Sequence, residues 1–108
     1  MDNKLIIQNY QTFLKTVNPK LVKTFDVAIS ILDDPNTQLV QIAYGSIDKT
    51  PMVLISYTNN NVPRTLGIKE TSIDIFNAKT KARIRHISFD HDNMTYNDVK
   101  TLSEFKPS

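Results

Sequence analysis

The densest apolar run of the 108-residue chain is residues 52–58, which read MVLISYT. Turn-forming residues bound this run on both sides, Thr50 and Pro51 before it and residues 59–63 (NNNVP) after it. Successive side chains of a strand point to opposite faces, and both alternating sets of this run contain large apolar residues. The run therefore predicts a strand in the interior of a sheet, covered on both faces, because an edge strand this apolar would promote aggregation.

Length and composition indicate one domain over residues 1–108. A chain of this size with 40% apolar residues can bury a core without crosslinks. It contains no cysteine, which excludes disulfides, thiolate nucleophiles and cysteine-ligated zinc. No segment approaches the roughly 20 apolar residues that span a bilayer, and residues 5–7 are too short a run for a signal peptide. These observations predict a cytoplasmic protein that does not associate with a membrane.

Amino-acid usage and charge distribution add two expectations. Residues with A/T-rich codons (Phe, Tyr, Met, Ile, Asn and Lys) number 44, against 14 residues with G/C-rich codons (Gly, Ala, Arg and Pro). This ratio predicts an A/T-rich genome, such as that of a low-GC bacterium or its phage. The net charge is only +2, but it is segregated: residues 1–25 carry +3, residues 26–63 carry −3, residues 64–86 carry +4 and residues 87–108 carry −2. Local patches therefore matter more than the total charge.

The first half of the chain predicts one helix and one hairpin. Apolar residues recur with the helical period over residues 3–17, and Asn18-Pro19 is a typical helix end. This amphipathic helix is expected to pack on its own sheet, with docking to a partner as the alternative. Residues 25–31 alternate apolar and small or polar side chains, as do residues 39–44, and residues 33–37 (DDPNT) have turn chemistry between them. The pattern predicts two strands joined as a hairpin.

The second half predicts further strands and a final helix. Apolar residues change parity between 66–68 and 73–75, so residues 69–72 are expected to hold a bulge or a bend. Residues 77–80 predict a short hairpin loop before a last strand over residues 81–89. Apolar residues then recur every three positions after Thr95, which predicts a short helix over residues 95–106. The predicted fold is α+β: an N-terminal amphipathic helix, a five- or six-stranded, mostly antiparallel meander as an open sheet or small barrel, and a short C-terminal helix.

A row of basic residues is the most distinctive polar feature of the sequence. Its members stand at a spacing of two: Lys79, Lys81, Arg83 and Arg85. On a strand all four point to one side, about 7 Å apart, a repeat that suits the phosphates of a single nucleic-acid strand. Arg64 and Lys69 could extend the row, and Tyr57 and Phe76 could offer stacking surfaces. The alternatives are a solvated strand whose charges block edge pairing and a site for an acidic protein.

Metal or catalytic chemistry has weaker support. Residues 86–93 (HISFDHDN) contain two histidines and two aspartates, and His86, Asp90 and His91 are the one candidate metal set. His86 and His91 would lie on opposite faces of a continuing strand, so a polar turn explains the cluster better. No spacing brings Ser56 or Ser88 to a histidine, and the chain has no glycine-rich phosphate loop. We therefore expect a protein that is not an enzyme and that holds no metal or cofactor.

Three functional hypotheses follow from the sequence. The first is a non-catalytic protein-interaction or assembly module, phage or accessory-element encoded, with the basic strand or the helix over residues 5–17 covered by a partner or by self-association. The second is a sequence-nonspecific nucleic-acid-binding protein that uses residues 79–85. The third is a metal-dependent enzyme at His86, Asp90 and His91. No motif identifies a family.

Overall fold

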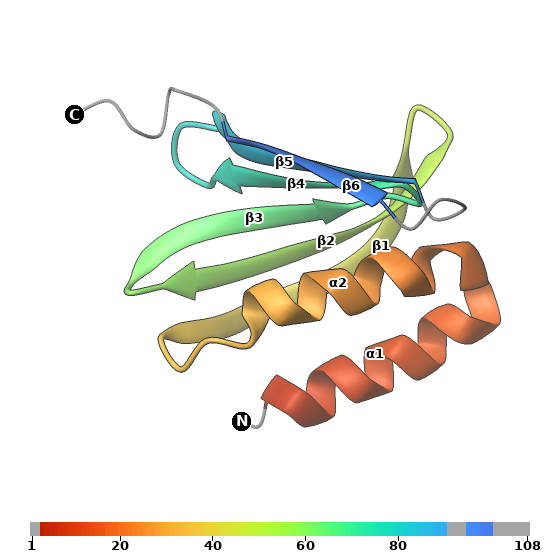
Figure 1. Cartoon of the computed structure of the whole chain (residues 1–108). Coiled ribbons are helices and arrows are strands. Elements are labelled where there is room, and N and C mark those ends of the chain that lie inside the picture. The colour runs from red at the N-terminus through yellow and green to blue at the C-terminus, as the bar shows by residue number, and fades with distance from the viewer. Residues whose placement is uncertain (1–2, 91–94, 101–108) are drawn as a thin grey trace.

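The computed structural model describes residues 3–90 and 95–100 and shows two helices on one side of an antiparallel sheet (Figure 1). The chain begins with α1 (Asn3–Val17), a 3₁₀ turn η1 (Pro19–Leu21) and α2 (Val22–Leu32). The strands follow in order: β1 (Thr37–Ile47), β2 (Thr50–Asn59), β3 (Val62–Ile68), β4 (Ser72–Asn77), β5 (Arg83–Asp90) and β6 (Thr95–Lys100). The predicted α+β class, the N-terminal helix and the antiparallel meander are thus confirmed.

The sheet is a simple meander in the order β1-β2-β3-β4-β5-β6. Every neighbouring pair is antiparallel, as short connections between consecutive strands require. β1 and β6 lie at opposite ends of this order, so the sheet is open and not a barrel. Within the described chain, β1 and β6 are therefore its two edge strands.

The segment over residues 25–31 is a helix, and its prediction as a strand is wrong. In α2 the buried side chains are Thr24, Phe25, Ala28 and Leu32, a spacing of three and four, while Val27 is 37% exposed. Apolar residues fill both a period of two and a period of 3.6 in this segment, so the local pattern suits both structures. Residues 33–37 consequently join a helix to a strand and do not close a hairpin.

The first true hairpin is β1–β2, and its short turn was not predicted from the sequence. Its two-residue turn consists of Asp48 and Lys49, which have φ values of 52° and 67°. Two successive positive φ values are the signature of the tight turn that matches strand twist, usually supplied by asparagine or glycine. Asn60 and Asn61 form the same kind of turn between β2 and β3, where the sequence did predict a loop.

The two later connections agree with their predictions. Residues 69–71 form the bend between β3 and β4, where the backbone N–H of Lys69 donates to the carbonyl of Ser72 at 2.8 Å. The loop before β5 begins at Asn77, whose side-chain oxygen accepts from the N–H groups of Lys79 and Thr80. Such side-chain-to-backbone bonds are what makes asparagine a turn residue.

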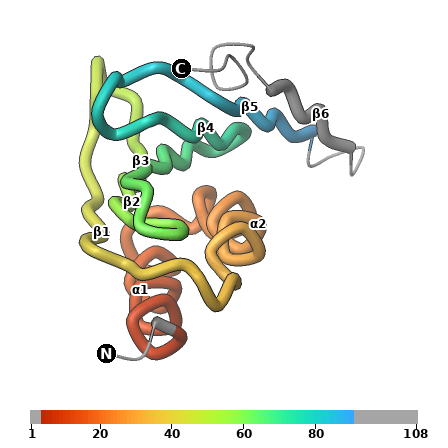
Figure 2. The backbone as a smooth tube through the Cα atoms, turned by 90° about the vertical axis from the view of Figure 1, so that its left-hand side faces the viewer, coloured from red at the N-terminus to blue at the C-terminus, as the bar shows by residue number. Residues whose placement is uncertain are grey.

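The core lies between the helices and one face of the sheet, here called the inner face; the opposite one is the outer face. Both views show α1 and α2 on the same side of the sheet (Figures 1 and 2). Inner-face residues pair across the strands, for example Ile55 with Leu66 and Leu66 with Ile75. The hydroxyl of Thr24 in α2 donates to the carbonyl of Glu70 at 2.5 Å, which fixes the start of α2 against the β3–β4 bend. The fully buried large apolar side chains are Leu14, Leu21, Phe25, Val53, Ile55, Leu66, Ile68 and Ile73.

The central strand is interior, and its two faces are covered unequally. β2 lies between β1 and β3, and Val53, Ile55 and Tyr57 are buried on its inner face. On the outer face Met52 is 8% exposed but Leu54 is 36% exposed, so the predicted coverage of both faces holds only in part. Both helices pack on the inner side of the sheet, which accounts for the difference.

The end of the described chain differs from the predicted C-terminal helix. Residues 95–100 form β6, which pairs with β5 from Asp90↔Thr95 to Arg85↔Lys100. The remainder of the predicted helix, residues 101–106, lies outside the described residues. An edge-pairing opportunity at β5 outweighs a weak local helical period, because each added strand satisfies a row of backbone groups. No helix within residues 3–90 and 95–100 is long and apolar enough to cross a membrane.

Candidate interaction surfaces

The four predicted basic residues do not form one row along a strand. Lys79 lies in the β4–β5 loop, and Lys81, at the end of that loop, has a φ of 65°. Only Arg83 and Arg85 belong to β5. The two-residue alternation that would align all four side chains therefore does not extend through this segment.

A bulge separates the two arginines that do lie on β5. Ile75 is opposite Arg85 and Phe76 is opposite Arg83, so Ile84 is an extra residue on β5. Arg85 shares the inner face with its partner Ile75, whereas Arg83 reaches Asp74 on the outer face, with 3.6 Å between the guanidinium and a carboxylate oxygen. An extra residue in one strand reverses the facing of the residues that precede it, which explains this division.

The structure nevertheless brings four basic residues to one end of the sheet, around the β4–β5 loop. The N–H of Ala78 donates to the carbonyl of Pro63 at 3.3 Å, and Arg64 is opposite Asn77, so the start of β3 lies beside this loop. We call this group the basic corner; its members are Arg64 on the inner face, Arg83 on the outer face, and Lys79 and Lys81 in the loop. Lys69 lies at the opposite end of β3.

The two candidate stacking residues lie on different faces. Tyr57 is buried on the inner face, opposite Arg64. Phe76 is half-buried on the outer face, where its ring would lie 3.8 Å from a Cβ added at Gly67. They cannot act together on one strand of bases, because the sheet separates them.

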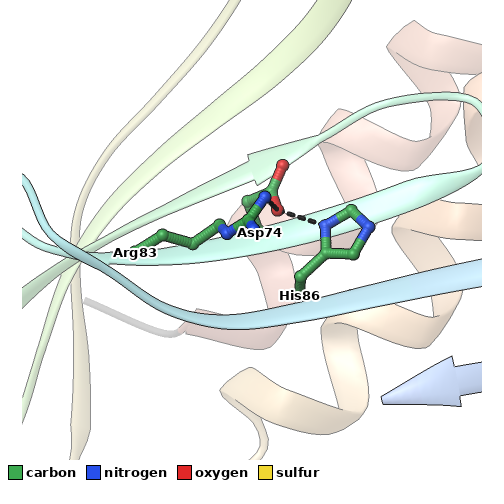
Figure 3. A network of polar contacts seen from close by, with 3 residues as sticks. All are labelled: Asp74, Arg83 and His86. Carbon is green, nitrogen blue, oxygen red and sulfur yellow. Dashed lines mark hydrogen bonds and ion pairs between the residues drawn. The ribbon is translucent and has the colours of Figure 1, made fainter. Parts of the chain in front are cut away.

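A polar network on the outer face links β4 to β5 through Asp74, Arg83 and His86 (Figure 3). Asp74 and His86 are directly opposite in the sheet, and the Nδ1–H of His86 donates a hydrogen bond to Oδ1 of Asp74. The same carboxylate oxygen forms an ion pair with the guanidinium of Arg83. Asp74 is 7% exposed, so its charge depends on these partners. Sequence reasoning missed Asp74; its one signal was an isolated carboxylate between Ile73 and Ile75.

The described residues around this network do not supply the further groups that catalysis or metal binding would need. Its Asp–His pair orients an imidazole as a catalytic triad does, but no hydrogen bond within the described chain joins His86 to Ser56 or Ser88. Among the residues that the structure describes, no three His, Cys, Asp or Glu side chains lie close enough together to hold a metal ion. His91, the other histidine of the predicted metal set, lies outside those residues.

The open side of β1 forms a third candidate surface, together with the neighbouring flank of α1. The rings of Phe13 in α1 and Tyr44 in β1 meet edge to face, with centroids 5.9 Å apart. Asn18 also donates from Nδ2 to the hydroxyl oxygen of Tyr44, at 3.5 Å. Exposed apolar side chains border this edge: Phe13 (41%), Val17 (44%), Val40 (69%) and Tyr44 (36%). We call the open edge of β1 with these four side chains the edge surface.

Tyr57 provides a pH-dependent check on the inner face. Burial raises the pKa of its phenol above the ordinary value of 10.0, and the guanidinium groups of Arg64 and Arg85 oppose that rise. From about pH 10 upward the unfolded chain loses a proton that the folded protein still holds. The free energy of unfolding is therefore expected to fall as the pH rises beyond about 10, and to fall less in a Tyr57→Phe variant. Urea titrations of both proteins at about pH 9 and about pH 11 measure the difference; an equal fall in both would contradict the burial of this phenol.

Three surfaces thus stand out on the described chain: the basic corner, the Asp74 network and the edge surface. Comparisons of the sequence and structure with protein families, characterised proteins and solved structures found no match. Of the three, the edge surface combines an edge strand of the described sheet with exposed apolar side chains, the two features typical of a protein contact.

Proposed function

We propose that this protein is a non-catalytic interaction module that binds another polypeptide through its edge surface. The observation that carries the proposal is the chemistry of β1. This edge strand is eleven residues long, reads TQLVQIAYGSI and contains no charged residue and no proline. An edge strand directs half of its backbone N–H and C=O groups away from its sheet, where they can pair with an added strand.

The two edges of the sheet differ in the devices that usually prevent such pairing. Natural edge strands carry charges, proline or bulges that block a second strand. The sequence of β6 includes Asp98 and Lys100, whereas β1 has one bulge, at Val40. From Gln41 to Ile47 the register with β2 is unbroken, which leaves a regular, uncharged segment able to accept a partner strand.

The exposed side chains support the same conclusion. Val40 is 69% exposed, and the exposed rings of Phe13 and Tyr44 contact each other beside the edge. Burial of apolar area supplies most of the free energy of protein association, at about 25 cal/mol per Å². A strand that pairs with β1 brings its own side chains over these residues.

A site-specific photo-crosslinker tests this function. Benzoylphenylalanine in place of Val40 is expected to give a discrete protein adduct in cells that express the chain. The matched control places it at Ser30, an exposed position in α2 away from the edge surface. Adducts at position 40 but not at position 30 are the expected result. Equal labelling of both positions, or none at position 40, would overturn the proposal.

A second candidate function is contact with the phosphate backbone of a nucleic acid at the basic corner. The specific support is the pair of exposed lysines, Lys79 and Lys81, in the β4–β5 loop, with Arg83 at the start of the following strand. Binding to a labelled single-stranded oligonucleotide is expected to weaken steeply with salt and to be lost in a Lys79→Glu/Lys81→Glu variant. A Lys15→Glu variant on α1 is the control, and fluorescence anisotropy is the measurement. Salt-independent binding, or equal loss in both variants, would contradict this role.

A further inference from the structure

We propose that the polypeptide bound at the edge surface is a second copy of this chain, and that the two β1 strands pair antiparallel about a twofold axis into one continuous sheet. This inference rests on the proposed function and names its partner. A twofold contact uses the same patch on both subunits, so the patch must complement itself.

The charges around β1 favour self-pairing in the antiparallel direction. No charge lies between Thr37 and Ile47, so two copies of the strand can approach without like-charge repulsion. Asp33 and Asp34 precede the strand, whereas Asp48 and Lys49, which follow it in the turn, together carry no net charge. Antiparallel pairing places the acidic end of one copy beside the neutral turn of the other, whereas parallel pairing would bring the two acidic ends together.

The position of α1 provides the second argument. A twofold axis perpendicular to the sheet keeps the inner faces of both copies on the same side. Because Phe13 contacts Tyr44, α1 lies on the β1 side of each inner face, and the two α1 helices would approach each other across the axis. Phe13 and Val17 are then covered by the same contact that satisfies the open backbone groups.

The charged residues of α1 do not oppose this approach. Lys4 and Lys15 are about 140–180° around the helix from Phe13 and Val17, at 100° per residue. They therefore lie away from the flank that would meet the second copy. One symmetric contact thus covers an uncharged edge and an apolar helix flank together.

Pairing between β1 of one copy and β6 of the next is the competing arrangement. That contact is heterologous, leaves one open edge at each end of the assembly and therefore extends into open chains. The two edges also differ in sequence, since β6 contains Asp98 and Lys100 and β1 contains no charge. Twofold pairing closes at two copies, and it predicts a finite dimer.

Light scattering after gel filtration, over a range of protein concentrations, tests the assembly. The twofold axis passes through the middle of the regular segment 41–47, near Tyr44. The expected result is a dimer whose dissociation constant rises at least about tenfold in a Gly45→Lys variant, since the axis brings the two new charges close together. Gly45 is exposed and a Cβ added there meets no atom within 4 Å, so this change does not disturb the core. A Ser30→Lys variant adds the same charge on α2 and is expected to dimerise like the unchanged protein. A strict monomer, open-ended growth, or equal effects of both variants would overturn the inference.

Single cysteines test the symmetry and register, because the natural chain contains none. A disulfide requires Cα atoms about 4.4–6.8 Å apart. Under mild oxidation, Tyr44→Cys at the middle of the regular segment 41–47 is expected to form a homodimeric disulfide, and Gln38→Cys and Ser46→Cys, farther from the axis, are expected to form little. Head-to-tail pairing of β1 with β6 gives no such disulfide at any of the three positions, and that result would overturn the twofold arrangement.

The outcomes separate this inference from the proposed function. A monomer whose crosslinker at position 40 captures a different protein would overturn self-pairing and leave the interaction module intact. A monomer with no adduct at position 40 would overturn both. A dimer that is weakened by Gly45→Lys, crosslinked at position 44 and labelled at position 40 with an adduct of twice the chain mass supports both.

Discussion

Replacing Phe25 with alanine is expected to lower the free energy of unfolding by about 3–5 kcal/mol, the range for truncating a buried aromatic side chain. Phe25 is fully buried in α2 and stacks on Tyr10 of α1, with ring centroids 5.9 Å apart. Its removal leaves a cavity where both helices meet the sheet. Because domains of this size are stable by only about 5–15 kcal/mol, this loss is a large part of the total. Urea titration followed by circular dichroism measures the change.

The matched control for this variant is Val27→Ala on the same helix. Val27 is 37% exposed, and its truncation is expected to cost less than about 1 kcal/mol. The pair also separates the helix from the strand that local sequence favours, because in a strand residues 25 and 27 would share one buried face. Similar losses for both variants would contradict α2.

The second large effect is expected for Asp74→Ala, at about 2–3 kcal/mol. The change removes the hydrogen-bond acceptor of His86 and the counter-ion of Arg83, and leaves two basic groups side by side on the outer face. The cost stays below that of a fully buried ion pair because the side chains of Arg83 and His86 are 49% and 29% exposed and regain water. Asp33→Ala is the control: this exposed aspartate at the C-terminal end of α2 is expected to change stability by less than about 0.5 kcal/mol.

A double-mutant cycle then isolates the contact between Asp74 and His86. Stabilities of Asp74→Ala, His86→Ala and the double variant are expected to give a coupling energy of about 1–2 kcal/mol. Additive losses would mean that the two side chains act independently, contrary to the hydrogen bond between them. The cycle matters because this network links β4 to β5 through polar side chains on the outer face.

The basic corner and the edge surface show how much could be predicted from the sequence. Sequence spacing identified the basic residues but did not predict how the structure arranges them. The loop that ends at Lys81 and the extra residue Ile84 place Arg83 and Arg85 on opposite faces. A bulge is a mismatch between two strands and has no signature in either strand alone. The edge surface depends on strand order in the same way, since an uncharged strand is exposed only if no neighbour covers it.

Local residue patterns sufficed wherever only one structure could satisfy them. The helix over residues 3–17 ends before a proline, the run over residues 52–58 lies between two turns, and the bend at residues 69–72 follows from a change in parity. These features depend on backbone preferences and on a single apolar period. The sequence by itself therefore determined the first helix, the interior strand and the later connections.

Tertiary structure decided the elements for which two local solutions compete. Residues 25–31 are apolar at both the strand and the helix period, and they fold as α2 because the inner face of the sheet needs a covering layer. Residues 95–100 have a weak helical period, yet they add to β5 as a sixth strand. In both cases the free energy comes from contacts distant in sequence, namely apolar burial beneath α2 and backbone pairing at β5, and a local pattern does not contain those contacts.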